Sequence, residues 1–388
     1  MDRRPLKLGV LGAGMIATYS YGVLPGLRHI PEKVELVAVA DPVFERAQEA
    51  QRQFNIPHAY ASLEEMLDHS NLDAVANLTP IPLHGATSQR ILEAGKHLVT
   101  EKPLATTLEE ADALIETAAM EGLVIVCAPP NMIFPYYQEV QRLIAAGTIG
   151  RVAFARVRSS NGGPAASTWP SDPTWFYQKG SGPLFDMGVY GIHEITGLLG
   201  PARRVMAFSG VTAPTRVVRG GPFQGKRIDV TADDNVLFML DFGQAAFATL
   251  DGTFNVNAAK APKIEIFGHA GTINIHDART QKLGAPPLEV YRVDAVPGIG
   301  GWIVPESRVL DLAQQRVEAL ERAILVDHLV DCVWEQRRPV LSAEHARHAL
   351  EIMLKVTESA RTGQVVELST SFQGPAHPDE GLATSVDM

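Results

Sequence analysis

The sequence predicts an α/β protein: a doubly wound parallel sheet in the N-terminal part, then an α+β domain with a large, mostly antiparallel open sheet. Short apolar runs alternate with helix-like segments up to about residue 128, a pattern typical of parallel sheets. Beyond Pro129-Pro130, most strand-like runs follow one another without helices between them, which favours antiparallel pairing. We therefore expect a first domain over residues 1–128, a second over 129–370 and a tail over 371–388.

The strands of the first domain should meet at one edge of the sheet, and ligands bind there. Two of its helices open with a capping box, Ser62 with Glu65 and Thr107 with Glu110. The first-domain strands are expected at 6–11, 34–40, 74–78, 97–100 and 123–127. In the second domain, strands are expected at 152–157, 205–211, 236–242, 245–250, 263–267 and 272–275, hairpin turns at 241–244 and 268–271, and helices at 134–146, 312–336 and 343–361.

A glycine pattern follows the first strand: Gly12-Ala13-Gly14-Met15-Ile16-Ala17 reads G-x-G-x-x-A at a strand-to-helix turn. The first glycine permits the tight turn, the second lets the backbone approach a pyrophosphate, and the small Ala17 allows close packing. Free N–H groups at the start of the helix, those of Met15 and Ile16, would face the phosphates. The pattern predicts a dinucleotide site.

Asp41 ends the second strand, about where an acidic residue binds the adenosine ribose. Its charge would repel a 2′-phosphate, so NAD is favoured over NADP. The alternative is that Asp41 only caps a helix that begins near Pro42.

Two further segments fall at strand ends and should border the nicotinamide. They are Thr79-Pro80 and Glu101-Lys102-Pro103. A lysine locked by proline at the end of a buried strand can direct its ammonium group into a crevice, although an ordinary turn lysine in water would give the same pattern. His84 supports the cofactor crevice or is a structural histidine.

In the second domain, a helix over 184–199 would place Asp186, Tyr190, His193 and Gly197 on one face. A glycine-rich stretch precedes this helix, and the composition suits a sugar-binding wall, or else an ordinary solvated face. Leu184, Met187, Ile195, Leu198 and Leu199 would pack on the sheet. Of the aromatic residues Trp169, Trp175, Phe176 and Tyr177, one is expected to line the pocket; the alternative is that they pack between domains. Substrate specificity should lie in loops such as 159–179 and 214–229.

Composition excludes several classes of protein. A net charge of −10 without basic runs argues against nucleic-acid binding, and no apolar run approaches the roughly 20 residues that span a membrane. Cys127 and Cys332 form no redox-like or metal-like pair, and the histidines lack ligand spacing. We expect a cytoplasmic protein without a metal site.

With these motifs, the chain resembles the Gfo/Idh/MocA oxidoreductase family, which includes glucose–fructose oxidoreductase and inositol dehydrogenase. The resemblance runs from Gly12 to about Leu368 and also rests on Gly95-Lys96-His97, Asp186-Met187-Gly188-Val189-Tyr190 and the segment 358–363. It implies a Rossmann domain, a C-terminal sheet whose exposed face serves in homodimers or homotetramers, and hydride exchange between a nicotinamide cofactor and a secondary alcohol of a sugar or cyclitol.

The resemblance also implies residue roles. Lys102 would bind the reacting hydroxyl and assist proton transfer, with Asp186 beside it. Many members have histidine where this chain has Tyr190 and aspartate where it has His193, so the proton carrier is Tyr190, His193 or Lys102. Two alternatives remain: a glycosidase that recycles tightly bound NAD, and a non-catalytic NAD-dependent sugar-binding regulator.

Overall fold

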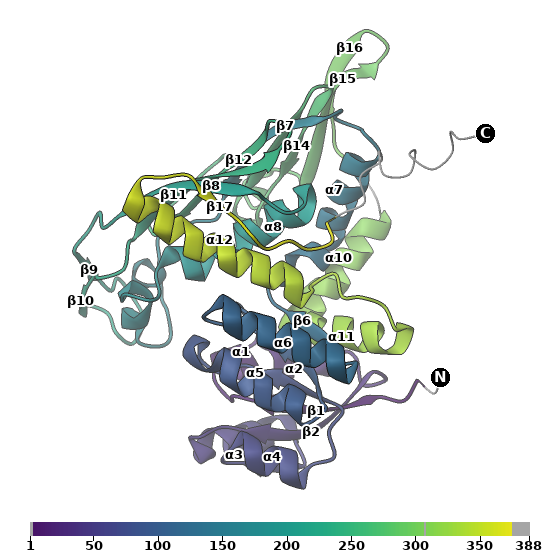
Figure 1. The fold of residues 1–388 in the computed structure, drawn as a ribbon, viewed down its shortest axis with the longest axis vertical. Helices are drawn as coiled ribbons and strands as arrows, with labels where there is room; N and C mark the ends of the chain where they lie inside the picture. Colours follow the sequence, from purple (N-terminus) through teal and green to yellow (C-terminus); the bar gives the residue numbers. More distant parts are fainter. Residues whose placement is uncertain (1–2, 306–307, 375–388) are drawn as a thin grey trace. The chain divides into compact units, whose positions relative to one another are not determined.

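The computed structural model describes residues 3–305 and 308–374, in a chain that divides into two compact units (Figure 1). Unit 1 consists of residues 1–134 and 309–350, and unit 2 of residues 135–308 and 351–388. The first compact unit thus extends to residue 134 and also includes residues 309–350. The tail expected over 371–388 lies outside the described residues from 375 onwards.

Unit 1 is built on a six-stranded parallel sheet with the order β3-β2-β1-β4-β5-β6. This order is typical of dinucleotide-binding domains, and it confirms the predicted doubly wound sheet. The short, half-exposed β3 has no apolar pattern, and the sequence did not predict it. The strands are β1 (Leu6–Leu11), β2 (Val34–Ala40), β3 (His58–Tyr60), β4 (Ala74–Asn77), β5 (His97–Thr100) and β6 (Ile125–Cys127).

Capping begins two of the helices of unit 1 as expected. The Ser62 hydroxyl accepts the Glu65 N–H at 3.1 Å, and the Thr107 hydroxyl accepts the Glu110 N–H at 3.2 Å. The helices of the first 134 residues are α1 (Met15–Thr18), α2 (Val23–Leu27), α3 (Phe44–Phe54), α4 (Leu63–His69), α5 (His84–Glu93) and α6 (Leu108–Glu121), with 3₁₀ turns η1 (Ile81–Leu83) and η2 (Pro130–Ile133).

The segment 309–350 belongs to unit 1 because it packs on the edge of the parallel sheet. α11 (Ile324–Glu335) contacts β5 and β6, and the Cys127 N–H donates to the Leu341 carbonyl at 3.1 Å. The single helix expected over 312–336 is instead α10 (Arg308–Leu320), the 3₁₀ turn η6 (Glu321–Ala323) and α11. The chain bends at Glu321, whose φ is +48°.

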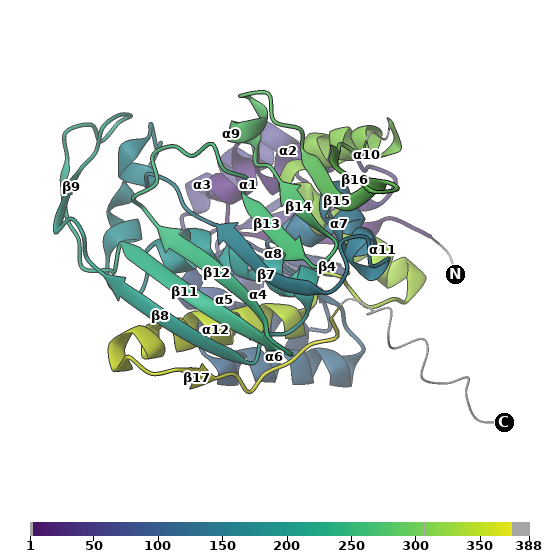
Figure 2. The same cartoon turned by 90° about the horizontal axis from the view of Figure 1, so that it is seen from above.

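Unit 2 contains a nine-stranded sheet with the order β16-β15-β14-β13-β7-β12-β11-β8-β17. Every pairing in it is antiparallel except that of β7 with β12, which confirms the mostly antiparallel sheet. Figure 2 looks onto its open face, with α8 (Val189–Leu199) on the far side. The strands are β7 (Val152–Arg158), β8 (Arg204–Gly210), β11 (Asn235–Gly243), β12 (Ala246–Thr253), β13 (Ile264–Gly268), β14 (Gly271–Ile275), β15 (Leu288–Val296), β16 (Ile299–Ile303) and β17 (Val366–Glu367).

Two hairpin turns were predicted, and one of them is displaced. Gly268 pairs with Gly271, as expected for a turn at 268–271. The other turn was expected at 241–244, but Gly243 pairs with Ala246. Gln244 and Ala245, with φ of +50° and +60°, form that turn after a bulge in β11. Neither residue type signals positive φ, which explains the error.

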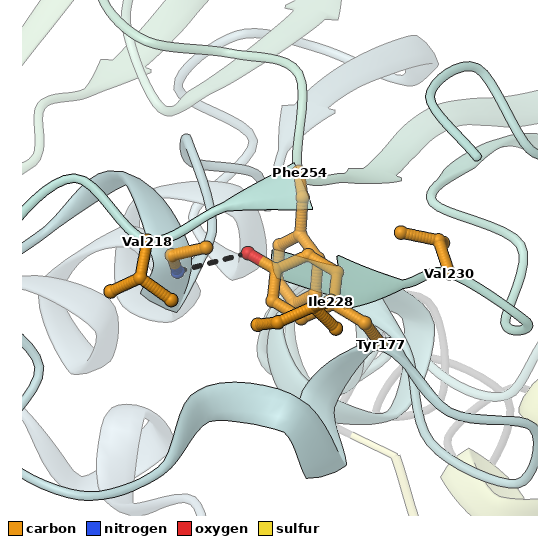
Figure 3. Packing of buried hydrophobic residues seen from close by; sticks show 6 residues of the cluster. Tyr177, Val218, Ile228, Val230 and Phe254 are labelled. Atoms are coloured by element: carbon orange, nitrogen blue, oxygen red, sulfur yellow. Dashed lines mark hydrogen bonds between the residues drawn. The ribbon is translucent and has the colours of Figure 1, made fainter. Parts of the chain in front are cut away.

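The two segments expected to control specificity pack together around a small apolar cluster (Figure 3). The first carries the 3₁₀ turns η3 (Pro164–Ala166) and η4 (Pro173–Tyr177), and the second forms the ribbon of β9 (Thr215–Val217) and β10 (Arg227–Asp229). The fully buried Tyr177 accepts the Ala165 N–H at 3.0 Å through its hydroxyl. The cluster consists of Ala165, Tyr177, Val218, Ile228, Val230 and Phe254.

The remaining helices are α7 (Pro135–Ala145), α9 (Ala278–Gln281) and α12 (Ala343–Thr362). Within residues 3–305 and 308–374, none of the helices combines the length and the apolar character needed to cross a membrane.

Candidate active site

The two glycines after β1 have different structural roles. Gly12 has φ of +97°, and a Cβ there would lie 2.8 Å from the Leu78 carbonyl oxygen, so the fold itself requires glycine. Gly14 has φ of −78°, and a Cβ there would meet no described atom within 4 Å. The backbone at Gly14 therefore faces open space, as a segment that receives a ligand would.

Helix α1 after these glycines is short, with four residues. Thr18, Tyr19 and Ser20 are poor helix formers, and Gly22 precedes a second short helix. Ala17 is fully buried, as predicted. Within the described part of the chain, the N–H groups of Met15 and Ile16 donate to no backbone carbonyl, because the first turn of a helix leaves such groups unpaired.

Asp41 connects the end of β2 to the glycine-rich turn. Its carboxylate accepts the Ala13 N–H and the Val43 N–H, both at 2.9 Å, and the residue is only 5% exposed. Helix α3 begins at Phe44 with Val43 as its N-cap residue. Asp41 is therefore not the cap of α3, which argues against the alternative considered from sequence.

His84 bridges the segments that follow β4 and β5. Its Nε2 lies 2.7 Å from the Thr79 carbonyl oxygen and its Nδ1 2.7 Å from the Pro103 carbonyl oxygen. A neutral ring can donate to one of these acceptors and a doubly protonated ring to both. The side chain is 1% exposed, so His84 sets the distance between Thr79-Pro80 and Lys102-Pro103.

Asn77, which sequence reasoning missed, also orders this edge. Its side-chain oxygen accepts the Thr79 hydroxyl at 2.7 Å, and its amide donates to Thr87 and Ser88 at 2.8 and 2.9 Å. A buried asparagine at the end of an apolar strand was the available signal.

Glu101 is buried and paired with Arg322 of η6. Arg322 Nη1 lies 2.9 Å from Glu101 Oε1, and the Lys102 N–H donates to Glu101 Oε2 at 3.3 Å. The guanidinium also lies 5.9 Å from the ring centre of Tyr21, beyond the glycine-rich turn. Arg322 thus ties the backbone at Lys102 to the opening segment of the domain. No local sequence pattern links Arg322 to Glu101, and the only signal was that a buried glutamate needs a cation.

Substituting Arg322→Gln is expected to lower the free energy of unfolding by about 3 kcal/mol, because it leaves the buried Glu101 carboxylate without its cation. Urea unfolding measures the change. The double variant Glu101→Gln/Arg322→Gln removes both charges and should recover much of the stability. A single variant as stable as the wild type would show that the pair does not stabilise unit 1.

In unit 2, the motif helix is present but begins differently from the prediction. Residues Leu184–Gly188 form a π-helical turn, η5, that leads directly into α8. Because a π turn closes i to i+5 bonds, it shifts Asp186 out of the α-helical register. Tyr190, His193 and Gly197 keep the predicted α-helical spacing within α8, and Asp186 is offset from it by the π turn. Asp186 and Tyr190 are half-buried, and His193 is 5% exposed.

Ser159 at the end of β7 holds the π turn in place. Its hydroxyl donates to the Met187 carbonyl and accepts the Gly191 N–H at 3.0 Å. Asp251 accepts the Ser159 N–H at 3.0 Å and the Ser160 hydroxyl. Burial raises the pKa of the Asp251 carboxyl. The Ser159 hydroxyl and the Asp251 carboxylate together fix the position of the turn that carries Asp186 and leads to Tyr190.

Glycines let this helix approach the sheet closely. A Cβ on Gly191 would lie 2.8 Å from the Ser159 Cβ, and a Cβ on Gly188 would lie 3.7 Å from the Gly252 Cα. Gly191 is therefore the position at which the helix lies too close to β7 for a side chain, whereas Gly188 makes ordinary van der Waals contact with β12.

Nearly all of α8 is buried, including Glu194, which sequence reasoning did not single out. Glu194 accepts the Tyr137 hydroxyl at 2.8 Å and pairs with Lys263. Five apolar residues were expected to pack on the sheet. Three of them are buried, namely Leu184, Ile195 and Leu198, and Met187 and Leu199 are half-buried.

The four aromatic residues before the motif helix have different surroundings. Tyr177 belongs to the apolar cluster, and Trp175 is 43% exposed. Trp169 and Phe176 meet edge to face at 5.4 Å.

The candidate residues fall into two groups, each held by its own unit. Thr79, Pro80, His84, Glu101 and Lys102 gather at the carboxyl ends of β4 and β5 in unit 1. Asp186, Tyr190 and His193 lie at the start of α8 in unit 2. Among residues 3–305 and 308–374, no group of three or more His, Cys, Asp or Glu could hold a metal ion.

Two family models match the chain. Residues 6–128 match the NAD-binding Rossmann-fold model of the GFO/IDH/MocA oxidoreductase family, and residues 137–274 match the family's C-terminal domain. The chain belongs to the Gfo/Idh/MocA oxidoreductase family. It is an NAD-dependent oxidoreductase, and the resemblance seen in its motifs is confirmed.

Curated relatives extend over most of the chain. Levoglucosan dehydrogenase of Pseudarthrobacter phenanthrenivorans is 28% identical over 304 residues, 72% of this chain and 75% of the relative. The scyllo-inositol 2-dehydrogenase (NAD(+)) of Bacillus subtilis is 24% identical over 363 residues, 94% of this chain and 96% of the relative. A solved levoglucosan dehydrogenase in complex with NADH has the same fold, with a TM-score of 0.81, 22% identity and coverage of 95% of this chain and 100% of that one.

Proposed function

We propose that this protein transfers a hydride between NAD and a secondary hydroxyl or ketone of a sugar, glycoside or cyclitol. The observation that carries the proposal is the placement of Lys102 directly beyond β5, anchored by the Glu101–Arg322 pair and the His84 bridge. The relatives described above, named for dehydrogenation of levoglucosan and scyllo-inositol, support this substrate class.

Residues of unit 1 would hold the cofactor. The open backbone at Gly14, with the N–H groups of Met15 and Ile16, suits the pyrophosphate, and Gly12 keeps the turn tight. Each Asp41 oxygen accepts one N–H and has a second lone pair for a ribose hydroxyl. Its negative charge disfavours a 2′-phosphate and hence NADP.

Bound NAD would supply the hydride acceptor at its nicotinamide ring, beside Thr79, Pro80, His84 and Glu101. Lys102, as the neutral amine, would position the substrate hydroxyl and accept its proton while the hydride leaves the carbinol carbon for the nicotinamide, which leaves a ketone and an ammonium group. Tyr190 or His193 passes the proton onward, and Asp186 orients the sugar.

The first test is near-ultraviolet absorbance of purified protein given NAD and a panel of cyclitols, aldoses and glycosides. NADH formed with one substrate class supports the proposal. Release of free sugar from a glycoside without net NADH would replace it by the recycled-cofactor glycosidase. Binding of NAD with neither product would indicate a regulator.

We also propose that the protein forms a homodimer or homotetramer through the open face of the nine-stranded sheet. Side chains on that face alternate with buried ones, and large apolar residues stand exposed, including Phe208 at 70%, Leu237 at 50% and Met239 at 46%. Apolar patches of this kind mark interfaces, and a second copy of the same face would cover them.

Substituting Phe208→Glu is expected to convert the oligomer to smaller species, because it places a charge in the apolar interface. Light scattering coupled to size exclusion measures the mass. The matched control is Leu283→Glu, at a site 71% exposed outside the sheet. A wild-type protein that is already monomeric would contradict the proposal.

A further inference from the structure

The segments 159–179 and 214–229 border a cavity of about 280 Å³ in unit 2. Five of the residues that line the cavity carry polar side chains, namely Thr215, Arg216, Arg219, Asn255 and Asn257. Tyr177, which belongs to the apolar cluster, also lines it. The cavity lies near the lower end of the volumes found for small-molecule sites.

The cavity has a rigid wall. A Cβ on Gly162 would lie 3.0 Å from the Asn257 side-chain oxygen, and a Cβ on Gly163 would lie 2.5 Å from the Tyr177 hydroxyl. The Arg219 N–H donates to the Ala165 carbonyl at 2.8 Å, which joins the two segments. Ala165 and Tyr177, which line the cavity, also belong to the apolar cluster of Figure 3. Close packing at the two glycines and this backbone hydrogen bond thus define the wall of the cavity.

Arg216 is held by protein groups on one side of its guanidinium. It pairs with Asp234, which is 1% exposed, and donates to the Asn255 side-chain oxygen at 2.7 Å. Burial by itself would raise the pKa of Asp234, but hydrogen bonds from Thr212 and Arg216 lower it. The Arg216 Nε is buried and has no hydrogen-bond partner among the described residues. The Arg216–Asp234 pair contributes no net charge.

Arg219 supplies the uncompensated charge. Its side chain is exposed and lines the cavity, and within the described part of the chain it forms no ion pair and no side-chain hydrogen bond. A guanidinium beside a second arginine and two amides matches the geometry of anionic oxygen groups.

We propose that this cavity binds an anionic group of the substrate, a carboxylate or a phosphate ester, so that the enzyme acts on a sugar acid or a sugar phosphate. The inference rests on the proposed function and narrows its substrate class. Tyr177 lies between the cavity and the segment of Asp186, because Met187, the next residue, packs against the apolar cluster that contains Tyr177. Burial raises the pKa of Tyr177, and the Asp186 carboxylate also acts to raise it. An anionic end held at Arg219 would therefore leave the rest of the sugar near Asp186.

Steady-state kinetics with NAD test this inference on hexuronates, hexose 6-phosphates and the parent hexoses. We expect higher kcat/KM for one anionic class, which also identifies the anion. Arg219→Gln should raise KM for that class about ten- to a hundredfold, the loss expected for a charged hydrogen bond. It should leave kcat and the KM of the neutral hexose unchanged. Arg219→Lys should restore part of the affinity, and Arg292→Gln, an exposed arginine on β15, serves as the control of equal charge change.

Neutral hexoses turned over as well as their anionic counterparts would overturn the inference but keep the proposed function. The same holds if Arg219→Gln affects both classes equally. If no sugar yields NADH, the proposed function fails. Thermal stabilisation by D-glucuronate or D-glucose 6-phosphate then tests whether the cavity binds an anion. Stabilisation of the wild type that is lost in Arg219→Gln supports the anion site, and no stabilisation overturns it.

Discussion

Substituting Lys102→Ala is expected to lower kcat by about 10²- to 10⁴-fold, the range typical for loss of a positioned proton-transfer group. The lysine follows β5 at the edge where parallel sheets bind ligands, and its backbone N–H is fixed by Glu101. The affinity for NAD should change little, because the glycine-rich turn and Asp41 carry most of the proposed cofactor contacts.

Single-turnover hydride transfer and NAD titration separate these two effects. Lys282→Ala is the matched control, since Lys282 is an exposed lysine in the turn between α9 and β15 of unit 2. Unchanged turnover in Lys102→Ala would remove Lys102 from the mechanism and leave Tyr190 or His193 as the proton acceptor. A parallel loss of NAD affinity would instead indicate that the lysine mainly binds the cofactor.

The second large effect is expected at Gly14. Gly14→Ala should weaken NAD binding about tenfold or more, because the added methyl group occupies the space left for the pyrophosphate, and overpacking of this kind costs about 1–3 kcal/mol. The melting temperature of the cofactor-free protein should not change, since a Cβ at this position meets no described atom within 4 Å.

Gly12→Ala is the contrasting variant. Its Cβ would lie 2.8 Å from the Leu78 carbonyl oxygen at φ of +97°, and strain of this type costs about 1–3 kcal/mol. The cofactor-free protein itself should therefore melt at a lower temperature. Differential scanning calorimetry and NAD titration of both variants distinguish the two roles. Equal melting losses in the two variants would contradict the separate roles of these glycines.

Local patterns were sufficient for the parts of the fold that depend on neighbouring residues. The bounds of β1, β2 and β5 coincide with the predicted runs, because buried parallel strands are continuous apolar segments. The glycine-rich turn, Asp41 and the Glu101-Lys102-Pro103 segment fall where the topology of such a sheet places them. The expected substrate class came from the resemblance of these motifs to the Gfo/Idh/MocA family.

What sequence could not predict depends on pairings between distant residues. Arg322 lies 221 positions from Glu101, and Ser159 reaches Met187 and Gly191 across a loop. The π turn at Asp186 is closed by that same hydroxyl, and nothing in the helical periodicity signals it. The cavity beside Arg219 is likewise formed by residues from three separate parts of the sequence: β9, the segment 162–166 and Asn255.

The division of the chain affects how the protein is made. The chain passes between the units three times, at residues 134, 308 and 350, so unit 1 draws on both early and late parts of the polypeptide. Lys33 pairs with Asp327 at 2.7 Å and with Asp331 at 2.6 Å, and Glu101 pairs with Arg322. A ribosome synthesises these counter-ions long after the parallel strands have emerged. The nucleotide-binding half of the enzyme is therefore completed only when most of the polypeptide has been translated.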